Sequence, residues 1–158
     1  MANVLVAYYS RSGNTEAMAR HVATGAKSAG ATVEVKQVSD VSMEDLLAAD
    51  AVVLGSPTYY GTMAAGVKDL LDRSVELHGQ LEGKVGGAFA SAGGVGGGQQ
   101  TTIVAILQAL LVHGMVLQGD PSGDHYGPVA VGKPDDRSAE QCRRWGERLA
   151  ALAQRLHL

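Results

Sequence analysis

The sequence predicts a single α/β domain in which a parallel sheet carries helices on both faces. Short apolar runs alternate five times with helical patterns along the 158 residues. The runs are apolar throughout, which is typical of strands that are covered on both sides. Because the sequence shows neither an internal repeat nor a linker, we expect one domain over residues 1–158.

The first half of the chain contains three of the expected strands. Met18, Val22 and Ala26 lie one helical turn apart, and Gly30 follows at a position suited to ending the helix. The expected elements are a strand at Asn3–Tyr8, a helix from Thr15 up to Gly30, a strand at Thr32–Val38, a short helix at Met43–Ala48 and a strand at Ala51–Gly55.

The second half begins with an expected loop over Ser56–Gly61, because Pro57 and Gly61 punctuate that stretch. A long loop is also expected over Asp120–Pro134, with a short extended piece at Val129–Val131. The regular elements are predicted as a helix at Met63–Val75, a strand at Lys84–Ala90, a helix at Thr101–Val112, a strand at Met115–Gly119 and a last helix at Ser138–Leu156.

Composition and charge exclude several classes of function. The net charge of −3 argues against a broad electrostatic grip on nucleic acid. Cys142 is the only cysteine, so no intramolecular disulfide is expected, and the histidine spacing predicts no metal site. No run approaches the roughly 20 apolar residues that cross a bilayer. The N-terminus does not resemble a signal peptide, so the expected location is cytoplasmic.

In a parallel sheet of this kind, ligands bind beyond the carboxyl ends of the strands. The loop after the first strand is rich in hydroxyl groups and leads into a helix N-terminus, which favours an anion. Because it has neither the lysine of a Walker-A loop nor a dinucleotide fingerprint, it suits one phosphate held by neutral groups. The alternative is an ordinary helix cap. The candidate residues are Ser10, Arg11, Ser12, Gly13, Asn14 and Thr15.

The loop after the third strand carries two adjacent aromatic residues. Tyr59 and Tyr60 are placed where they would flank a flat ring, and stacking of rings adds to the gain from burial. The alternative is that one tyrosine packs on the sheet edge. The candidates in this loop are Pro57, Thr58, Tyr59, Tyr60 and Gly61.

The loop after the fourth strand consists mainly of glycine. With so few side chains, its backbone can approach the edge of a planar ligand, and its N–H groups can bond to ring carbonyls and nitrogens. A merely flexible loop is the alternative. The candidates are Ser91, Ala92, Gly93, Gly94, Gly96 and Gly97.

Several stretches resemble known families. Ser10–Thr15 resembles the phosphate loop of flavodoxins. Four further stretches resemble the FMN-dependent NAD(P)H:quinone oxidoreductases once described as Trp-repressor-binding proteins, namely Gly55–Ala64, Gly96–Ile103, His113–Met115 and Tyr126–Gly127. The similarity covers nearly the whole chain, and it implies a flavodoxin-like, doubly wound five-stranded sheet with strand order 2-1-3-4-5.

The resemblance implies that FMN is bound by the three loops. It also implies that His113 reaches a flavin, either in its own chain or in a neighbouring subunit. His78, His125 and Tyr126 are candidates for contact with the substrate at the rim. The sequence departs from the family at Leu77–His78, where the family carries a tryptophan, and in a shorter segment before Pro57.

Three functions are weighed. The open glycine loop and the modest net charge of −3 favour two-electron transfer from NAD(P)H through FMN to a quinone-like acceptor. The alternative is a flavodoxin that carries single electrons between redox partner proteins. A flavin-free binding module is the third possibility. No catalytic acid or base is assigned, because the flavin itself carries the hydride.

The helix predicted at Thr101–Val112 is apolar almost all round, with Gln108 as the main exception. An ordinary surface helix has a single apolar stripe. We therefore expect part of this helix to be buried between chains, in a homodimer or homotetramer. The alternative is that the Asp120–Pro134 segment covers it within one chain.

Overall fold

A computed structural model describes residues 1–157. Short 3-10 turns follow β2 at Val38–Asp40 and follow α3 at Ser74–Leu77. The strands and helices are β1 (Asn3–Tyr8), α1 (Asn14–Ser28), β2 (Thr32–Gln37), α2 (Met43–Ala48), β3 (Ala51–Tyr59), β4 (Thr62–Met63), α3 (Ala65–Arg73), β5 (Val85–Ala92), α4 (Gln99–Val112), β6 (Val116–Leu117), β7 (Val129–Val131) and α5 (Asp136–Leu156).

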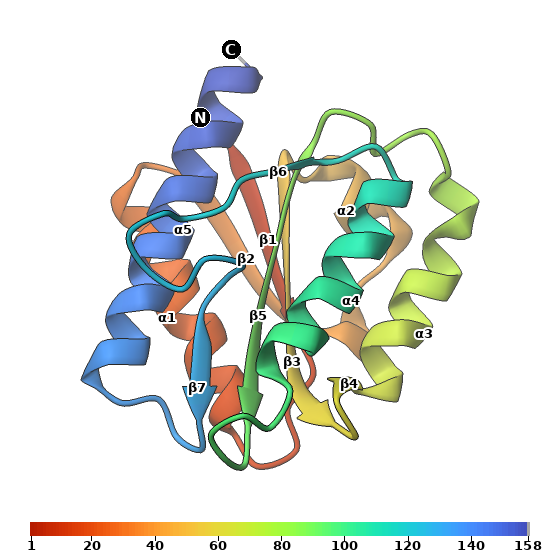
Figure 1. Ribbon diagram of the computed structural model, residues 1–158. Coiled ribbons are helices and arrows are strands. Elements are labelled where there is room, and N and C mark those ends of the chain that lie inside the picture. The colour runs from red at the N-terminus through yellow and green to blue at the C-terminus, as the bar shows by residue number, and fades with distance from the viewer. Residues whose placement is uncertain (158) are drawn as a thin grey trace.

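The sheet has the predicted strand order. Its main strands run β2-β1-β3-β5-β6, all parallel, which is the order 2-1-3-4-5 of the five predicted strands (Figure 1). The fifth position is divided, because β6 pairs with the start of β5 and β7 pairs with its end. The predicted strand at Met115–Gly119 is therefore only two residues long, and the extended piece at Val129–Val131 completes that edge of the sheet.

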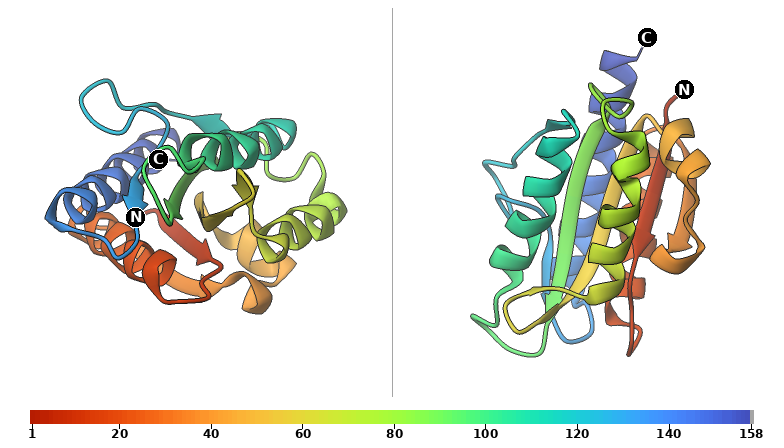
Figure 2. Two further views of the ribbon diagram at one scale, coloured as in Figure 1. Left: turned by 60° about the horizontal axis from the view of Figure 1, so that its bottom comes forward. Right: turned by 90° about the vertical axis from the view of Figure 1, so that its right-hand side faces the viewer.

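The helices form a layer on each face of the sheet, as predicted (Figure 2). Successive residues of β1 alternate between the layers, since side chains of a strand point to opposite faces. Val4 and Val6 join a core with α1 and α5, whereas Leu5 and Ala7 join a core with α2, α3 and α4. The sheet is thus buried on both sides, which explains why its strands are apolar throughout.

Helices α1 and α5 approach each other at two glycines. A Cβ atom on Gly25 would collide with the backbone of Arg143, and one on Gly146 would collide with the backbone of Val22. These two positions let the helices pack backbone against backbone, which fixes α1 and α5 to each other on one face of the sheet.

The predicted loop at Ser56–Gly61 is wrong in part. Strand β3 continues to Tyr59 and turns back through a hairpin into β4. The turn residues Tyr60 and Gly61 both have positive φ, 48° and 78°, as the tightest hairpins require. Pro57 is compatible with a strand here because β1 pairs with β3 only as far as Gly55, so β3 is locally an edge strand.

Candidate functional site

The three predicted loops meet beyond the carboxyl ends of β1, β3 and β5, at the lower end of the molecule in Figure 1. They surround a hollow of about 160 Å³. Figure 2 shows this end of the molecule turned toward the viewer in its left view. The lining residues are Ser10, Arg11, Ser12, Asn14, Thr15, Pro57, Thr58, Tyr59, Ser91, Ala92, Gly93 and Gly132.

The first loop presents an open helix N-terminus to the hollow. Gly13 precedes α1 with a φ of 94°, and no side chain caps the first turn of the helix. The Gly13 N–H donates to the Ser10 hydroxyl at 3.0 Å, which folds the loop back on itself. The N–H groups of the first turn therefore remain available to an anion, and the helix dipole adds attraction.

A buried hydroxyl pair joins the first loop to the third. Thr15 Oγ1 lies 2.9 Å from Ser91 Oγ, and both residues are almost fully buried. Ser91 lies near the end of strand β5, before the glycine loop begins. The phosphate loop is thus fixed directly to the strand that carries the glycine loop.

In the second loop the two tyrosines have different surroundings. Tyr59 lines the hollow and meets Tyr9 edge to face, with ring centroids 6.3 Å apart. Tyr60 stands at the tip of the hairpin and is fully exposed. Tyr59 is therefore the aromatic group that borders the hollow, and Tyr9 supports it from behind.

The hairpin is fastened to the start of α4. The Thr101 hydroxyl donates to the Gly61 carbonyl at 2.6 Å, and the Thr102 hydroxyl donates to the Thr58 hydroxyl at 3.1 Å. Gly98 has a φ of 106°, and a Cβ atom there would lie 3.0 Å from the Cα atom of Gly61. Only glycine allows this approach without strain.

The third loop carries few side chains, with Val95 exposed among its glycines. A Cβ atom on Gly93, Gly94 or Gly96 would meet nothing within 4 Å. The loop keeps its shape through the Gly94 carbonyl, which accepts from the Gly97 N–H at 3.2 Å and from the Gln99 side chain at 3.3 Å. The loop is therefore ordered by its own hydrogen bonds while its outer flank is open.

His113 and His78 lie at the opposite end of the sheet. His113 ends α4, far along the helix from the glycine loop, and its Nε2 lies 2.7 Å from the Ser74 hydroxyl. Its Nδ1 is buried without a hydrogen-bond partner within residues 1–157. Burial, and secondarily His78, hold the pKa of His113 below its ordinary value. Within one chain, the structure does not bring either histidine to the three loops.

His125 and Tyr126 lie in the segment that divides the fifth strand position. This segment is anchored by Asp120, whose carboxylate is bound by Arg144 at 2.7 and 3.2 Å. The Arg144 hydrogen bond outweighs burial and holds the pKa of Asp120 at about 2. His125 Nδ1 lies 2.8 Å from the Asp120 carbonyl. Both predicted rim residues thus border the outer edge of the sheet and do not line the hollow.

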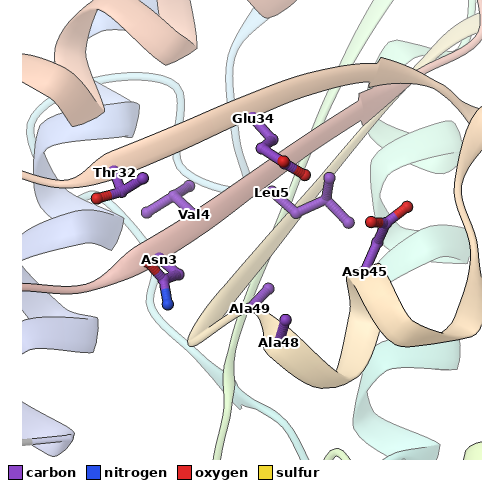
Figure 3. A pocket seen from close by; sticks show the side chains of 8 residues that line it. All are labelled: Asn3, Val4, Leu5, Thr32, Glu34, Asp45, Ala48 and Ala49. Atoms are coloured by element: carbon purple, nitrogen blue, oxygen red, sulfur yellow. The ribbon is translucent and has the colours of Figure 1, made fainter.

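A second hollow, of about 200 Å³, lies on the other half of the molecule beneath the short helix α2 (Figure 3). Val4 and Leu5 border it, together with the carboxylates of Glu34 and Asp45. Both carboxylates are paired with Lys36, at 3.3 and 2.7 Å. Because both carboxylates are already paired with Lys36, we assign no reactive group to this hollow.

The comparisons with known proteins agree with this geometry. Residues 3–125 match the model of the NADPH-dependent FMN reductase family. The chain belongs to this family. A solved WrbA-like flavodoxin from Agrobacterium tumefaciens superposes with a TM-score of 0.83 at 27% identity, over 98% of this chain and 99% of that one. An archaeal flavodoxin gives a TM-score of 0.80 at 30% identity, over 96% and 99% of the two chains.

Relatives of this chain carry two kinds of name. A flavodoxin of Aquifex aeolicus is 41% identical over 95% of this chain and 86% of its own length. NAD(P)H dehydrogenases (quinone) of Archaeoglobus fulgidus and Rhodopseudomonas palustris are 32% and 35% identical, each over 99% of this chain and all of the relative. The latter alignments span 190 and 198 positions, so these relatives have about 30–40 residues without a counterpart among the 158 residues here.

The residues at the hollow fit FMN, the cofactor of this flavodoxin-like oxidoreductase. Neutral hydroxyls and free amides at the start of α1 match a monophosphate, and Tyr59 offers a flat apolar surface nearby. Residues 1–157 contain no cluster of side chains that would hold a metal ion, and no helix among them is long and apolar enough to cross a membrane.

Sequence reasoning missed three contributors to the site. Gly132 lines the hollow from the loop after β7, and its N–H donates to the Ala92 carbonyl at 2.8 Å. Thr101 and Thr102 hold the hairpin, although they were interpreted only as part of a helix. The sequence does contain a signal for this role, because two threonines stand at the start of a helix directly after a glycine loop.

Proposed function

We propose that this protein is an FMN-dependent NAD(P)H:quinone oxidoreductase. The observation that carries the proposal is the loop Gly93–Gly98, in which Gly93 lines the hollow and only Val95 carries a side chain, so this flank of the hollow is sparsely covered. An uncovered flank admits one flat substrate after another. Bound FMN would supply the redox chemistry by accepting a hydride from the nicotinamide and passing two electrons to the quinone.

The residues of this chain bind and orient the cofactor. The hydroxyls of Ser10, Ser12 and Thr15 and the amides at the start of α1 would hold the phosphate. Tyr59 would contact the ring, and the backbone from Ser91 to Gly97 would approach the ring edge. No carboxylate or histidine lines the hollow in the described residues 1–157, so protons would be exchanged with water at its open mouth.

The test is anaerobic stopped-flow spectroscopy of the FMN-loaded protein. NAD(P)H should bleach the flavin absorbance, and a water-soluble benzoquinone should restore it, in ping-pong order. If NAD(P)H leaves the flavin oxidised while a flavodoxin reductase reduces it, the proposed function is wrong. The matched variant is Gly94→Phe, whose side chain would cover the open wall and should slow the quinone step.

A one-electron carrier is the second candidate. It is favoured by the 41% identity to a flavodoxin and by the 30–40 residues that the quinone dehydrogenase relatives have in addition. A carrier exchanges single electrons with partner proteins. It would therefore be distinguished by slow reaction with NAD(P)H and fast reaction with a reduced ferredoxin-type protein.

We also propose that the protein forms a homodimer or homotetramer through α4. Val104, Leu111 and Val112 are exposed on this helix, at 36%, 58% and 71%. The 118–128 segment does not cover them, so the patch is free in one chain. His113 would reach a flavin only through such a neighbour. Light scattering tests this, with Leu111→Glu expected to give a monomer of about 16.3 kDa.

Because its electron donor is a nicotinamide dinucleotide, the proposed location is cytoplasmic.

A further inference from the structure

Most cationic side chains of this chain are already paired. Of the 13 Lys and Arg residues, nine bind a carboxylate or a carbonyl oxygen. Arg11, Lys27, Lys133 and Arg155 make no such contact within residues 1–157. The paired residues are Arg20, Lys36, Lys68, Arg73, Lys84, Arg137, Arg143, Arg144 and Arg148.

The four unpaired cations have two different settings. Lys27 and Arg155 lie in the last turns of α1 and α5, where the negative end of the helix dipole stabilises a cation. Arg11 and Lys133 precede the first turns of the same two helices, where the dipole disfavours a cation. Helix dipoles therefore explain the first pair and not the second.

Arg11 lies at the hollow, and Lys133 is adjacent in sequence to a residue of its lining. Arg11 lines it directly, and Lys133 follows Gly132, which lines it from the loop after β7. Both side chains are exposed, so they are free to move toward a bound group. No carboxylate lines the hollow within the described residues, and the protein as a whole carries a net charge of −3. Two cations without an ion-pair partner are thus placed at or beside the hollow.

Two of the three nearby carboxylates are otherwise engaged. Glu16 binds Arg20 at 2.6 Å, and Asp135 caps α5 by accepting from the Ser138 N–H at 2.8 Å. The Ser138 hydrogen bonds hold the pKa of Asp135 below its ordinary value. Asp136, in the first turn of α5, forms no ion pair with Lys133 in the described residues.

We propose that Arg11 and Lys133 bind the phosphates of the pyridine dinucleotide that reduces the flavin. This inference rests on the proposed function. One phosphate, that of FMN, is matched by the open N-terminus of α1 and the neutral hydroxyls of its loop. The two mobile cations then face a second anion, and a dinucleotide brings a pyrophosphate and, in NADPH, a 2′-phosphate. Long, exposed cations suit a substrate that must leave after each turnover.

The experiment measures binding of NADP+ and NAD+ to the oxidised FMN-loaded protein by calorimetry, beside the rate of flavin reduction by NADPH and NADH. Lys133→Gln should weaken NADP+ binding about fivefold, the upper range for an exposed charge pair. Arg11→Gln with Lys133→Gln should weaken it about twentyfold and flatten its dependence on salt. The matched control is Lys27→Gln, which removes the same charge at the opposite end and should change binding less than twofold.

The two dinucleotides identify the phosphate. If Lys133→Gln weakens NADP+ and leaves NAD+ unchanged, the cation binds the 2′-phosphate, and if both weaken equally, it binds the pyrophosphate. Unchanged binding of both, or an equal loss in Lys27→Gln, would overturn the proposal. A loss of FMN affinity in Lys133→Gln, measured by flavin fluorescence, would also overturn it by assigning the lysine to the cofactor. Binding of NADP+ without flavin reduction would contradict the proposed function itself, whereas flavin reduction with binding unchanged in the variants would overturn this inference alone.

Discussion

The two ends of the sheet are built from the same strands and helices, yet they treat their polar groups in opposite ways. At the amino end, several polar groups are paired within the fold, although His113 Nδ1 is not: the Asn3 N–H donates to Asp50, and Lys84 binds the last carbonyls of α2 at 2.8 and 2.6 Å. At the carboxyl end, α1 and α4 begin at positive-φ glycines without any side-chain cap.

Of the other helices, which also begin on the carboxyl side of the sheet, α2 and α5 are capped by side chains and α3 is not. Ser42 and Asp135 close the N-termini of α2 and α5 with reciprocal capping boxes. A capped helix satisfies its free N–H groups internally, whereas an uncapped one leaves them for water or a ligand. The difference teaches that the site is marked by polar groups the fold leaves unused, more than by the presence of any one residue type.

The largest expected effect is on the uncapped helix. Ser12→Ala with Thr15→Val should weaken FMN binding at least about 100-fold, because hydrogen bonds to a charged group contribute roughly 1.5–3 kcal/mol each. Flavin fluorescence titration measures this. The comparison is Ser42→Ala, which should lower the free energy of unfolding by about 1 kcal/mol and leave FMN affinity unchanged. An equal loss of FMN affinity in both variants would remove the distinction between the two helix starts.

The next effect concerns the close contact between the hairpin and α4. Gly98→Ala should lower the free energy of unfolding of the apoprotein by about 2 kcal/mol, because a left-handed alanine costs roughly 1–2 kcal/mol and its Cβ crowds Gly61. Gly93→Ala should cost less than about 0.5 kcal/mol, since its Cβ meets nothing. Urea titration of the two variants compares them. A similar loss in both would show that the loop is constrained along its whole length.

The smallest effect is a pH dependence at the amino end. The pKa of His113 is lowered in the folded protein, so below pH 6.5 the unfolded chain binds a proton more readily than the folded one. The contribution of neutral His113 to the free energy of unfolding is therefore fully present above pH 6.5. It is lost as the pH falls toward the pKa that His113 has in the folded protein. The slope should be at most about 1.4 kcal/mol per pH unit.

The measurement is urea unfolding between pH 8 and pH 5.5. His113→Gln should remove this slope, because glutamine does not titrate. FMN affinity should not follow the same titration in a monomeric variant, since His113 lies away from the hollow. If it does, the two ends of the sheet are coupled.

The sequence predicted the arrangement of the sheet well because its strands are buried on both faces. A run such as Ala51–Gly55 is apolar at every position only if helices cover it from both sides, and this fixes strand and layer together. The sequence does not predict the hairpin after Gly55, because whether a strand tolerates a proline depends on the strand beside it. Pro57 is tolerated in β3 only because β1 has already ended there. Where β1 ends relative to β3 is a feature of the tertiary structure, and the turn-forming residues near Pro57 do not reveal it.

The predicted site residues fall into two groups, according to whether strand direction alone determines their position. Most residues of the three loops lie at the hollow, because their position follows from strand direction alone. His78, His113, His125 and Tyr126 do not, because each follows a helix or a segment that leads away from the carboxyl end. Whether His113 approaches a flavin depends on a second chain, and one sequence does not specify that packing.

The division of the fifth strand position gives the fold a place where length can change at low cost. β7 is held by its own pairing with β5, opposite Ala90 to Ala92, and does not depend on a continuous strand from β6. Residues added to or removed from the 118–128 segment would leave Gly132 where it is, provided that Asp120 keeps its two arginines. A designer could therefore insert a recognition element here, beside the sheet edge, and keep the flavin hollow unchanged.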